Sequence, residues 1–322
     1  MTVTTHTPPR RLGSLLNRSV LLAAFFVIEL AIFGFSVPNY LSVDGVLDTS
    51  RVFIEAGLLS LGMTLVIITG GIDLSVAALL ALVSVVIGFS HQAGVPLPLA
   101  MMLGVIVGTG CGLLNGAIVA YLHLHPLVVT LATMALFRGA AYVISNAEAF
   151  SSYPEWFTNI GGYYIAGTVP AQLPVFVLIC VVVWVILAKT AFGRAIYGLG
   201  ENEMAVQFSG VNVERVKLKV YGLMGLLVSI AAIIETSRIS TSRANMAVGL
   251  ELPVIAAVVL GGTKITGGYG TVTGTIFGLL ILWYLQDGLQ FAGISADWGL
   301  VITGAFLILG VLVNENLGKV RD

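Results

Sequence analysis

Charged residues are scarce in this chain: only 10% of its 322 residues are Asp, Glu, Lys or Arg, against about 25% in an ordinary soluble domain. Hydrophobic residues make up 57% of the chain. One soluble core cannot bury so apolar a composition, so the sequence predicts a bundle of membrane helices. Nothing in the sequence indicates nucleic-acid binding.

Groups for metal binding or catalysis are equally sparse. The two cysteines, Cys111 and Cys180, lie inside apolar runs and are interpreted as packing residues rather than a disulfide framework or metal site. Gly262-Thr263-Lys264 lacks the G-x-x-x-x-G-K-[ST] spacing of a phosphate loop. An intramembrane enzyme would need a paired nucleophile or a metal set, and neither is found. We therefore expect no catalytic residue, metal or nucleotide site in this chain.

Ten apolar stretches are candidates for spanning helices, which need about 20 residues each. They are residues 19–37, 52–70, 74–90, 98–120, 127–145, 173–189, 219–238, 252–262, 273–291 and 298–314. Several are short and interrupted by glycine, as broken or re-entrant helices are. The sequence predicts an all-α integral membrane protein of about ten transmembrane helices, within a transmembrane domain at 19–314.

Lysine and arginine predict the orientation, because they concentrate on the cytoplasmic side of membrane proteins. Ten crossings from a cytoplasmic N-terminus place most of them inside: Arg10, Arg11, Arg18, Lys189, Arg194, Arg215, Lys217, Lys219, Lys264, Lys319 and Arg321. The tails 1–18 and 315–322 and the loop 190–218 are then cytoplasmic. Loop 146–172 is periplasmic, either as a plain interfacial loop or as the surface that receives a substrate-delivering protein.

Two glycine patterns bear on the organisation of the bundle. Residues 61–75 and 253–268 each run an apolar stretch into a Gly-Gly turn, which suggests two related halves. The stretch 98–120 carries four glycines at i+4 spacing, which favours close helix packing rather than a site. These are Gly104, Gly108, Gly112 and Gly116.

Ionisable residues within the predicted spans cost about 2.5–3.5 kcal/mol each on insertion scales and usually face the bundle interior or a wet cavity. Glu55 and Glu235 lie near span ends, where reaching the membrane surface explains them. Glu29 and Arg138 lie in mid-span and are candidates for structural pairing or for function. Asp287 belongs to a polar stripe.

That stripe is Trp283, Gln286, Asp287 and Gln290, which share one helix face. An aromatic ring flanked by amides and a carboxylate suits a polyhydroxylated ring. A second stripe, with Thr130 at its start, runs through the span 127–145. It holds Thr133, Phe137 and Arg138. Both stripes are candidates for the solute pathway, and both are equally compatible with interhelical contacts.

The segment from Thr190 to Lys219 is the only long polar, basic stretch between two long apolar blocks. In a membrane protein such a segment is where the chain meets a soluble partner. We interpret it as the docking site of an ATPase, so that nucleotide hydrolysis elsewhere moves the surrounding helices.

Three motif blocks resemble those of ribose-type ABC importer permeases, in the branched-chain amino-acid/ribose permease superfamily. The first is Gly62 to Ile67 followed by Gly70-Gly71-Ile72-Asp73-Leu74-Ser75. The second runs from Phe192-Gly193-Arg194 to Ser209-Gly210, and the third from Gly261 through Gly267, Gly268 and Gly270 to Thr275. The resemblance covers roughly residues 20–315, with the blocks in the same order.

The resemblance implies a subunit of the bacterial inner membrane with four kinds of partner. These are a second permease subunit, a periplasmic solute-binding protein, a sugar-like solute and a cytoplasmic ABC ATPase that binds ATP and Mg. The ATPase would receive a coupling helix at about Gly200–Gly210. The implied contact residues are Arg194, Gly200, Glu201, Asn202, Glu203, Ala205, Ser209 and Gly210.

The resulting hypothesis is a permease that imports a monosaccharide or a similar small polyol and is not itself an enzyme. The family often has Asn-Asn-Gly-Leu where this chain has Gln286-Asp287-Gly288-Leu289, so the solute need not be ribose and includes autoinducer-2 among its candidates. One alternative is a secondary carrier with Glu29 or Asp287 as proton relay. Another is a branched-chain amino-acid permease, which the Gly70–Ser75 block disfavours.

Overall fold

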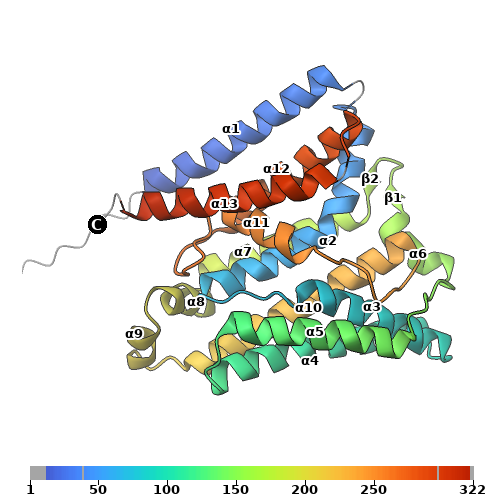
Figure 1. The fold of residues 1–322 in the computed structure, drawn as a ribbon, viewed down its shortest axis with the longest axis horizontal. Coiled ribbons are helices and arrows are strands. Elements are labelled where there is room, and N and C mark those ends of the chain that lie inside the picture. Colours follow the sequence, from blue (N-terminus) through green and yellow to red (C-terminus); the bar gives the residue numbers. More distant parts are fainter. Residues whose placement is uncertain (1–11, 38–39, 296, 320–322) are drawn as a thin grey trace, which may run out of the picture.

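The computed structural model describes residues 12–37, 40–295 and 297–319, so the predicted tails at 1–11 and 320–322 lie outside the described residues. The chain is mainly helical, and the order of its elements is shown in Figure 1. The elements are α1 (Leu12–Ser36), α2 (Val43–Ile68), α3 (Val76–Gln92), α4 (Leu97–Tyr121), α5 (Pro126–Ser145), α6 (Glu155–Gly162), β1 (Tyr164–Ile165), β2 (Val169–Pro170), α7 (Gln172–Lys189), α8 (Ala191–Glu201), α9 (Glu203–Phe208), α10 (Val213–Ile239), α11 (Glu251–Leu260), α12 (Val272–Phe291) and α13 (Asp297–Lys319).

Each of the ten predicted apolar stretches corresponds to one helix of the structure. Among the described residues, α2, α4, α5, α7, α10 and α12 are long and apolar enough to cross a membrane. The prediction of an all-α membrane protein is confirmed at this level, with the two-residue strands β1 and β2 as a small addition. The boundaries differ, since α1 begins at Leu12 and α13 ends at Lys319, inside the stretches predicted as tails.

Local polar contacts explain where several helices begin and end. Asn212 accepts a hydrogen bond from the amide of Arg215 over 2.7 Å and so starts α10. Thr271 starts α12 in the same way, through the amide of Gly274 at 3.0 Å. Asn146 ends α5 with φ at 51°, the left-handed conformation common after a helix.

The helices form a bundle with distinct ends (Figure 1). The short helices α8 and α9 lie at one end, and α6 with the β1–β2 hairpin lies at the other. The predicted loops 190–218 and 146–172 therefore fall at opposite ends, which is the arrangement their opposite topological assignments need.

The centre of the bundle is α2. In its most apolar stretch 89% of the residues are buried, against 28% in α4, α5 and α7. Helix α2 packs against α7, α10, α11 and α12, while α3 packs against α4, α5 and α10. The three less buried helices expose large apolar side chains, as membrane-facing helices do. These include Leu103, Ile106, Val128, Leu136, Leu178 and Val181.

The glycines of α4 form the packing seam that their spacing predicts. A Cβ at Gly112 would overlap the carbonyl oxygen of Tyr221 and lie 3.0 Å from the Cα of Gly225, both on α10. Gly116 also faces α10, where Leu218 Cα would lie 3.0 Å from an added Cβ. The backbones of α4 and α10 therefore approach closely and gain dispersion contacts that larger residues would prevent.

Candidate coupling site and solute pathway

The polar segment between the apolar blocks folds into two short helices rather than one. Thr190 accepts from the amide of Gly193 over 3.0 Å and starts α8, which buries Ile196 and Leu199. Asn202 lies between the helices and its side-chain oxygen accepts from the amide of Ala205 over 2.9 Å. Asn202 is therefore a helix cap, because this bond satisfies a donor that the first turn of α9 leaves free.

Helix α9 stands clear of the bundle, and none of its residues is buried. Its Met204 is 67% exposed and its Phe208 is 88% exposed, one turn apart on the helix. Exposed large apolar side chains at a polar segment are typical of surfaces that contact another protein or a membrane. Sequence reasoning selected the polar residues here and missed these two, although their i, i+4 spacing was readable.

The predicted polar contact residues divide between the surface and local structure. Arg194, Glu201 and Glu203 are exposed. Glu203 forms an ion pair with Lys217 on α10, with Nζ 2.7 and 2.8 Å from the two carboxylate oxygens. Ser209 donates to the carbonyl of Val206 over 2.6 Å and thus helps to end α9.

The residues of the first motif block shape the turn between α2 and α3. Asp73 is 1% exposed and accepts from the amide and the hydroxyl of Ser75, over 2.9 and 2.6 Å. Asn115 of α4 donates to the same hydroxyl over 2.9 Å. Gly70 has φ at +82°, a conformation that favours glycine, and Gly71 lies against the hydroxyl of Tyr221. This block therefore has a structural role that joins α2, α3, α4 and α10.

The first and third motif blocks meet in space. The amide of Gly268 donates to the carbonyl of Ile68, the last residue of α2, over 2.9 Å. Tyr197 of α8 donates its hydroxyl to the carbonyl of Gly270 over 2.8 Å. The end of α2 and the third motif block thus lie against α8, which belongs to the second block.

The stripe on α12 does not gather around one space. Trp283 is buried at 8% exposure, and Gln290 is exposed. Gln286 donates to Thr303 of α13 over 2.9 Å, whereas Asp287 accepts from Thr49 of α2 over 2.7 Å. Two of the four residues therefore bind two different neighbouring helices, and these contacts favour the interhelical alternative for them.

The stripe on α5 behaves similarly. Phe137 is buried, and Thr133 donates to the carbonyl of Thr130, over 3.4 Å. Arg138 donates from one guanidinium nitrogen to the carbonyls of Ala244 and Met246, over 2.6 and 2.8 Å. Arg138 therefore anchors the loop between α10 and α11, a role that its position in the sequence did not reveal.

The carboxylates within the bundle have unequal surroundings. Glu55 was expected to reach the membrane surface, but its side chain is 3% exposed and pairs with Arg238 over 2.8 Å. That expectation is wrong, because Arg238 supplies the compensating charge within the bundle. Glu29 is 5% exposed, and neither of its carboxyl oxygens has a hydrogen-bond partner among the described residues.

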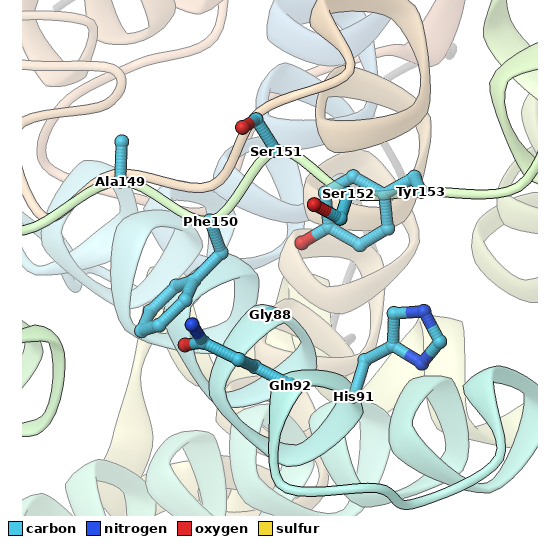
Figure 2. Close-up of a pocket in the computed structure, with 8 residues that line it drawn as sticks. All are labelled: Gly88, His91, Gln92, Ala149, Phe150, Ser151, Ser152 and Tyr153. Carbon is cyan, nitrogen blue, oxygen red and sulfur yellow. The ribbon is translucent and has the colours of Figure 1, made fainter.

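A cavity of about 330 Å³ opens between the end of α3 and the segment that precedes α6 (Figure 2). Figure 2 shows His91 and Gln92 at the end of α3. They face Phe150 and Tyr153, which lie in the segment before α6. The His91 and Tyr153 rings are stacked, with 6.0 Å between centroids. The lining residues are Gly88, His91, Gln92, Ala149, Phe150, Ser151, Ser152 and Tyr153.

Two residues that line this cavity, Phe150 and Tyr153, are hydrogen-bonded to Ser242 in the α10–α11 loop. Phe150 and Ser242 exchange both backbone hydrogen bonds, at 3.0 and 2.8 Å. The hydroxyls of Tyr153 and Ser84 lie 2.6 and 2.8 Å from that of Ser242. Burial raises the pKa of the Tyr153 phenol, although its bond to Ser242 lowers it in part. The phenol therefore stays neutral and bonded near neutral pH.

Comparisons with known proteins agree over nearly the whole chain. A family model described as "Branched-chain amino acid transport system / permease component" matches residues 45–311. The autoinducer 2 import system permease protein LsrD of Escherichia coli (strain K12) is 35% identical over 297 residues, which are 90% of this chain and 90% of the relative. The protein of the same name from Shigella flexneri has the same identity and coverage. No solved structure matches the chain significantly.

Proposed function

We propose that the solute of this chain is autoinducer 2 or a closely related furanose. The chain belongs to the family of branched-chain amino acid transport system permease components. It is a multi-pass inner-membrane permease of an ABC importer for small sugar-like solutes. The relatives at 35% identity are named for autoinducer 2 import. The Gln286-Asp287 pair departs from the ribose-type pattern, but its contacts with Thr303 and Thr49 are interhelical, so the proposal of the solute rests on the relatives.

The partners follow from the two ends of the bundle. An ATPase that binds ATP and Mg would contact the α8–α9 end, and a periplasmic solute-binding protein would contact the end with α6 and the hairpin. A second permease subunit would complete the pair. In this arrangement the chain crosses the membrane about ten times, and both termini are cytoplasmic, as the placement of lysine and arginine favours.

The observation that carries the ATPase assignment is the exposure of Met204 and Phe208 on α9, at 67% and 88%. A side chain so exposed at a membrane protein's aqueous end gains little from lipid, and a partner groove would bury it. Burying one large apolar side chain contributes about 1.5–3 kcal/mol. Two such anchors one turn apart are enough to place a short helix in a groove.

The test is co-purification from detergent-solubilised membranes with Phe208→Asp. We expect the wild-type chain to bring down an ATPase and a periplasmic binding protein, and Phe208→Asp to lose the ATPase. Gln207→Ala is the matched control, because Gln207 is exposed on the same helix. An ATPase that stays bound to Phe208→Asp would remove α9 from the interface.

Uptake measurements test the solute and the energy source. Labelled autoinducer 2 should be taken up, and an excess of unlabelled ribose or leucine should inhibit that uptake only weakly. Uptake that an uncoupler stops while ATP remains would favour the secondary carrier, with Glu29 or Asp287 as relay. Uptake that leucine blocks would favour a branched-chain amino-acid permease.

A further inference from the structure

Three backbone segments meet at Gly200, near the end of α8. A Cβ here would overlap the carbonyl oxygen of Ile68 and the amide nitrogen of Gly268, and would lie 2.9 Å from the carbonyl carbon of Gly267. Every residue other than glycine carries that Cβ. The end of α2, the turn at 264–270 and α8 therefore touch backbone to backbone.

Further contacts hold the same arrangement. The hydrogen bond from Gly268 to Ile68 joins the 264–270 turn to α2 directly, at 2.9 Å. Tyr197, one turn before Gly200, bonds to the carbonyl of Gly270 over 2.8 Å. Gly267 and Gly268 have φ at +89° and +75°, so the turn itself is built on glycine. Helix α8 is thus attached to this turn at two points along its length.

We propose that Gly200 is a positioning residue of the transport cycle, which lets α8 press on the end of α2 and on the 264–270 turn at once. Displacement of α9 then moves both segments together. The inference rests on the proposed function, because it takes α9 as the ATPase contact. Helix α8 runs through Asn202 directly into α9, and the amide of Asn202 bonds to Gly198 over 2.9 Å.

The physical reason is the absence of side chains between these backbones at Gly200. A contact made through a long side chain absorbs a small shift by a change of rotamer, whereas packed backbones pass it on. Ile68 ends α2, the most buried of the six candidate spans, and the 264–270 turn connects α11 to α12. Ile68 lies in the stretch 61–75 and the 264–270 turn begins in the stretch 253–268, whose similarity suggests two related halves, so one short helix would move a segment of each.

The experiment compares three variants in the complete complex with ATPase and binding protein, reconstituted in liposomes. Gly200→Ala inserts a methyl group between the three backbones. Gly198→Ala is the control two residues earlier, because its Cβ would meet no backbone atom and only one side-chain atom, the Cγ2 of Val206 on α9 at 2.8 Å, which a shift of that side chain can relieve. Tyr197→Phe removes one hydrogen bond and keeps the ring. The two readouts are ATP hydrolysis and uptake of autoinducer 2.

We expect Gly200→Ala to retain the ATPase and to hydrolyse ATP, with about tenfold more ATP consumed per molecule taken up, a coupling loss of ordinary size. Tyr197→Phe should show a smaller rise, and Gly198→Ala should match the wild type. A rise of this kind separates transmission from simple packing, which would lower both activities together.

Several results would overturn the inference. One is Gly200→Ala with a wild-type ratio of ATP to solute, and another is loss of the ATPase from this variant, which would assign Gly200 to docking. If Gly200→Ala fails to assemble, Tyr197→Phe decides, and a wild-type ratio there counts against transmission. A wild-type chain that binds no ATPase would instead refute the proposed function.

Discussion

The Nε of Arg238 on α10 donates to a carboxylate oxygen of Glu55 on α2 over 2.8 Å, where the Glu55 side chain is 3% exposed. A buried ion pair is balanced only while both charges are present, because either charge alone pays its desolvation without compensation. Glu55→Ala should therefore lower the free energy of unfolding by about 3–5 kcal/mol. Thermal unfolding in detergent measures this change.

The double variant Glu55→Met with Arg238→Met is the control for that prediction. It removes both charges and keeps comparable volume, so its stability should be close to that of the wild type. If Glu55→Ala unfolds at the wild-type temperature, water reaches the pair and the argument from burial fails.

A second ion pair, between Glu203 and Lys217, has the opposite character. The Glu203 side chain is 49% exposed, and exposed pairs contribute about 0–1 kcal/mol. Glu203→Lys should therefore leave insertion and stability nearly unchanged, yet weaken ATPase co-purification, because it repels Lys217 and displaces α9. Insertion is checked by membrane fractionation.

The charge swap Glu203→Lys with Lys217→Glu distinguishes two explanations of such a loss. Recovery of the ATPase would show that the pair orients α9. Continued loss would show that Glu203 meets the partner directly. Full co-purification of Glu203→Lys alone would remove both explanations.

Apolar runs and glycine spacing predicted the helices and a packing seam on α4, but not its partner α10, because the first two depend on residues close in sequence. The role of Asn202 as a helix cap also depends on residues close in sequence. We nevertheless expected the polar segment to hold one coupling helix, whereas it holds α8 and α9. The pairing of Glu55 with Arg238 was not predictable, since 183 positions separate them. Periodicity placed Gln286 and Asp287 on one face of a helix, but it could not show that Thr303 and Thr49 lie opposite them. Which residue lies opposite a given helix face is decided by tertiary packing, which sequence periodicity does not report.

Arg138 gives a third prediction, which concerns dynamics. Arg138→Met removes the donors to the carbonyls of Ala244 and Met246, and hydrogen bonds from charged groups contribute about 1.5–3 kcal/mol each. Amides in the loop 240–250 should exchange hydrogen faster, as mass spectrometry would detect. Arg243→Met is the control, because Arg243 is exposed in the same loop. If Arg138→Met reduces solute uptake but leaves hydrogen exchange in the loop unchanged, Arg138 belongs to the solute pathway and does not anchor the loop.

The glycine seam supplies the last prediction, with a control on the same helix. A Cβ at Gly112 would overlap the carbonyl oxygen of Tyr221, and backbone cannot move aside as a side chain can. Gly112→Ala should therefore push α4 away from α10 and lower the free energy of unfolding by about 1–3 kcal/mol, as overpacking does.

Gly110, on the same helix, supplies the control, because an added Cβ there meets nothing within 4 Å. Gly110→Ala should be neutral or slightly stabilising, because alanine favours the helix by up to about 1 kcal/mol. Equal unfolding temperatures for the two variants would show that α4 and α10 are not in backbone contact.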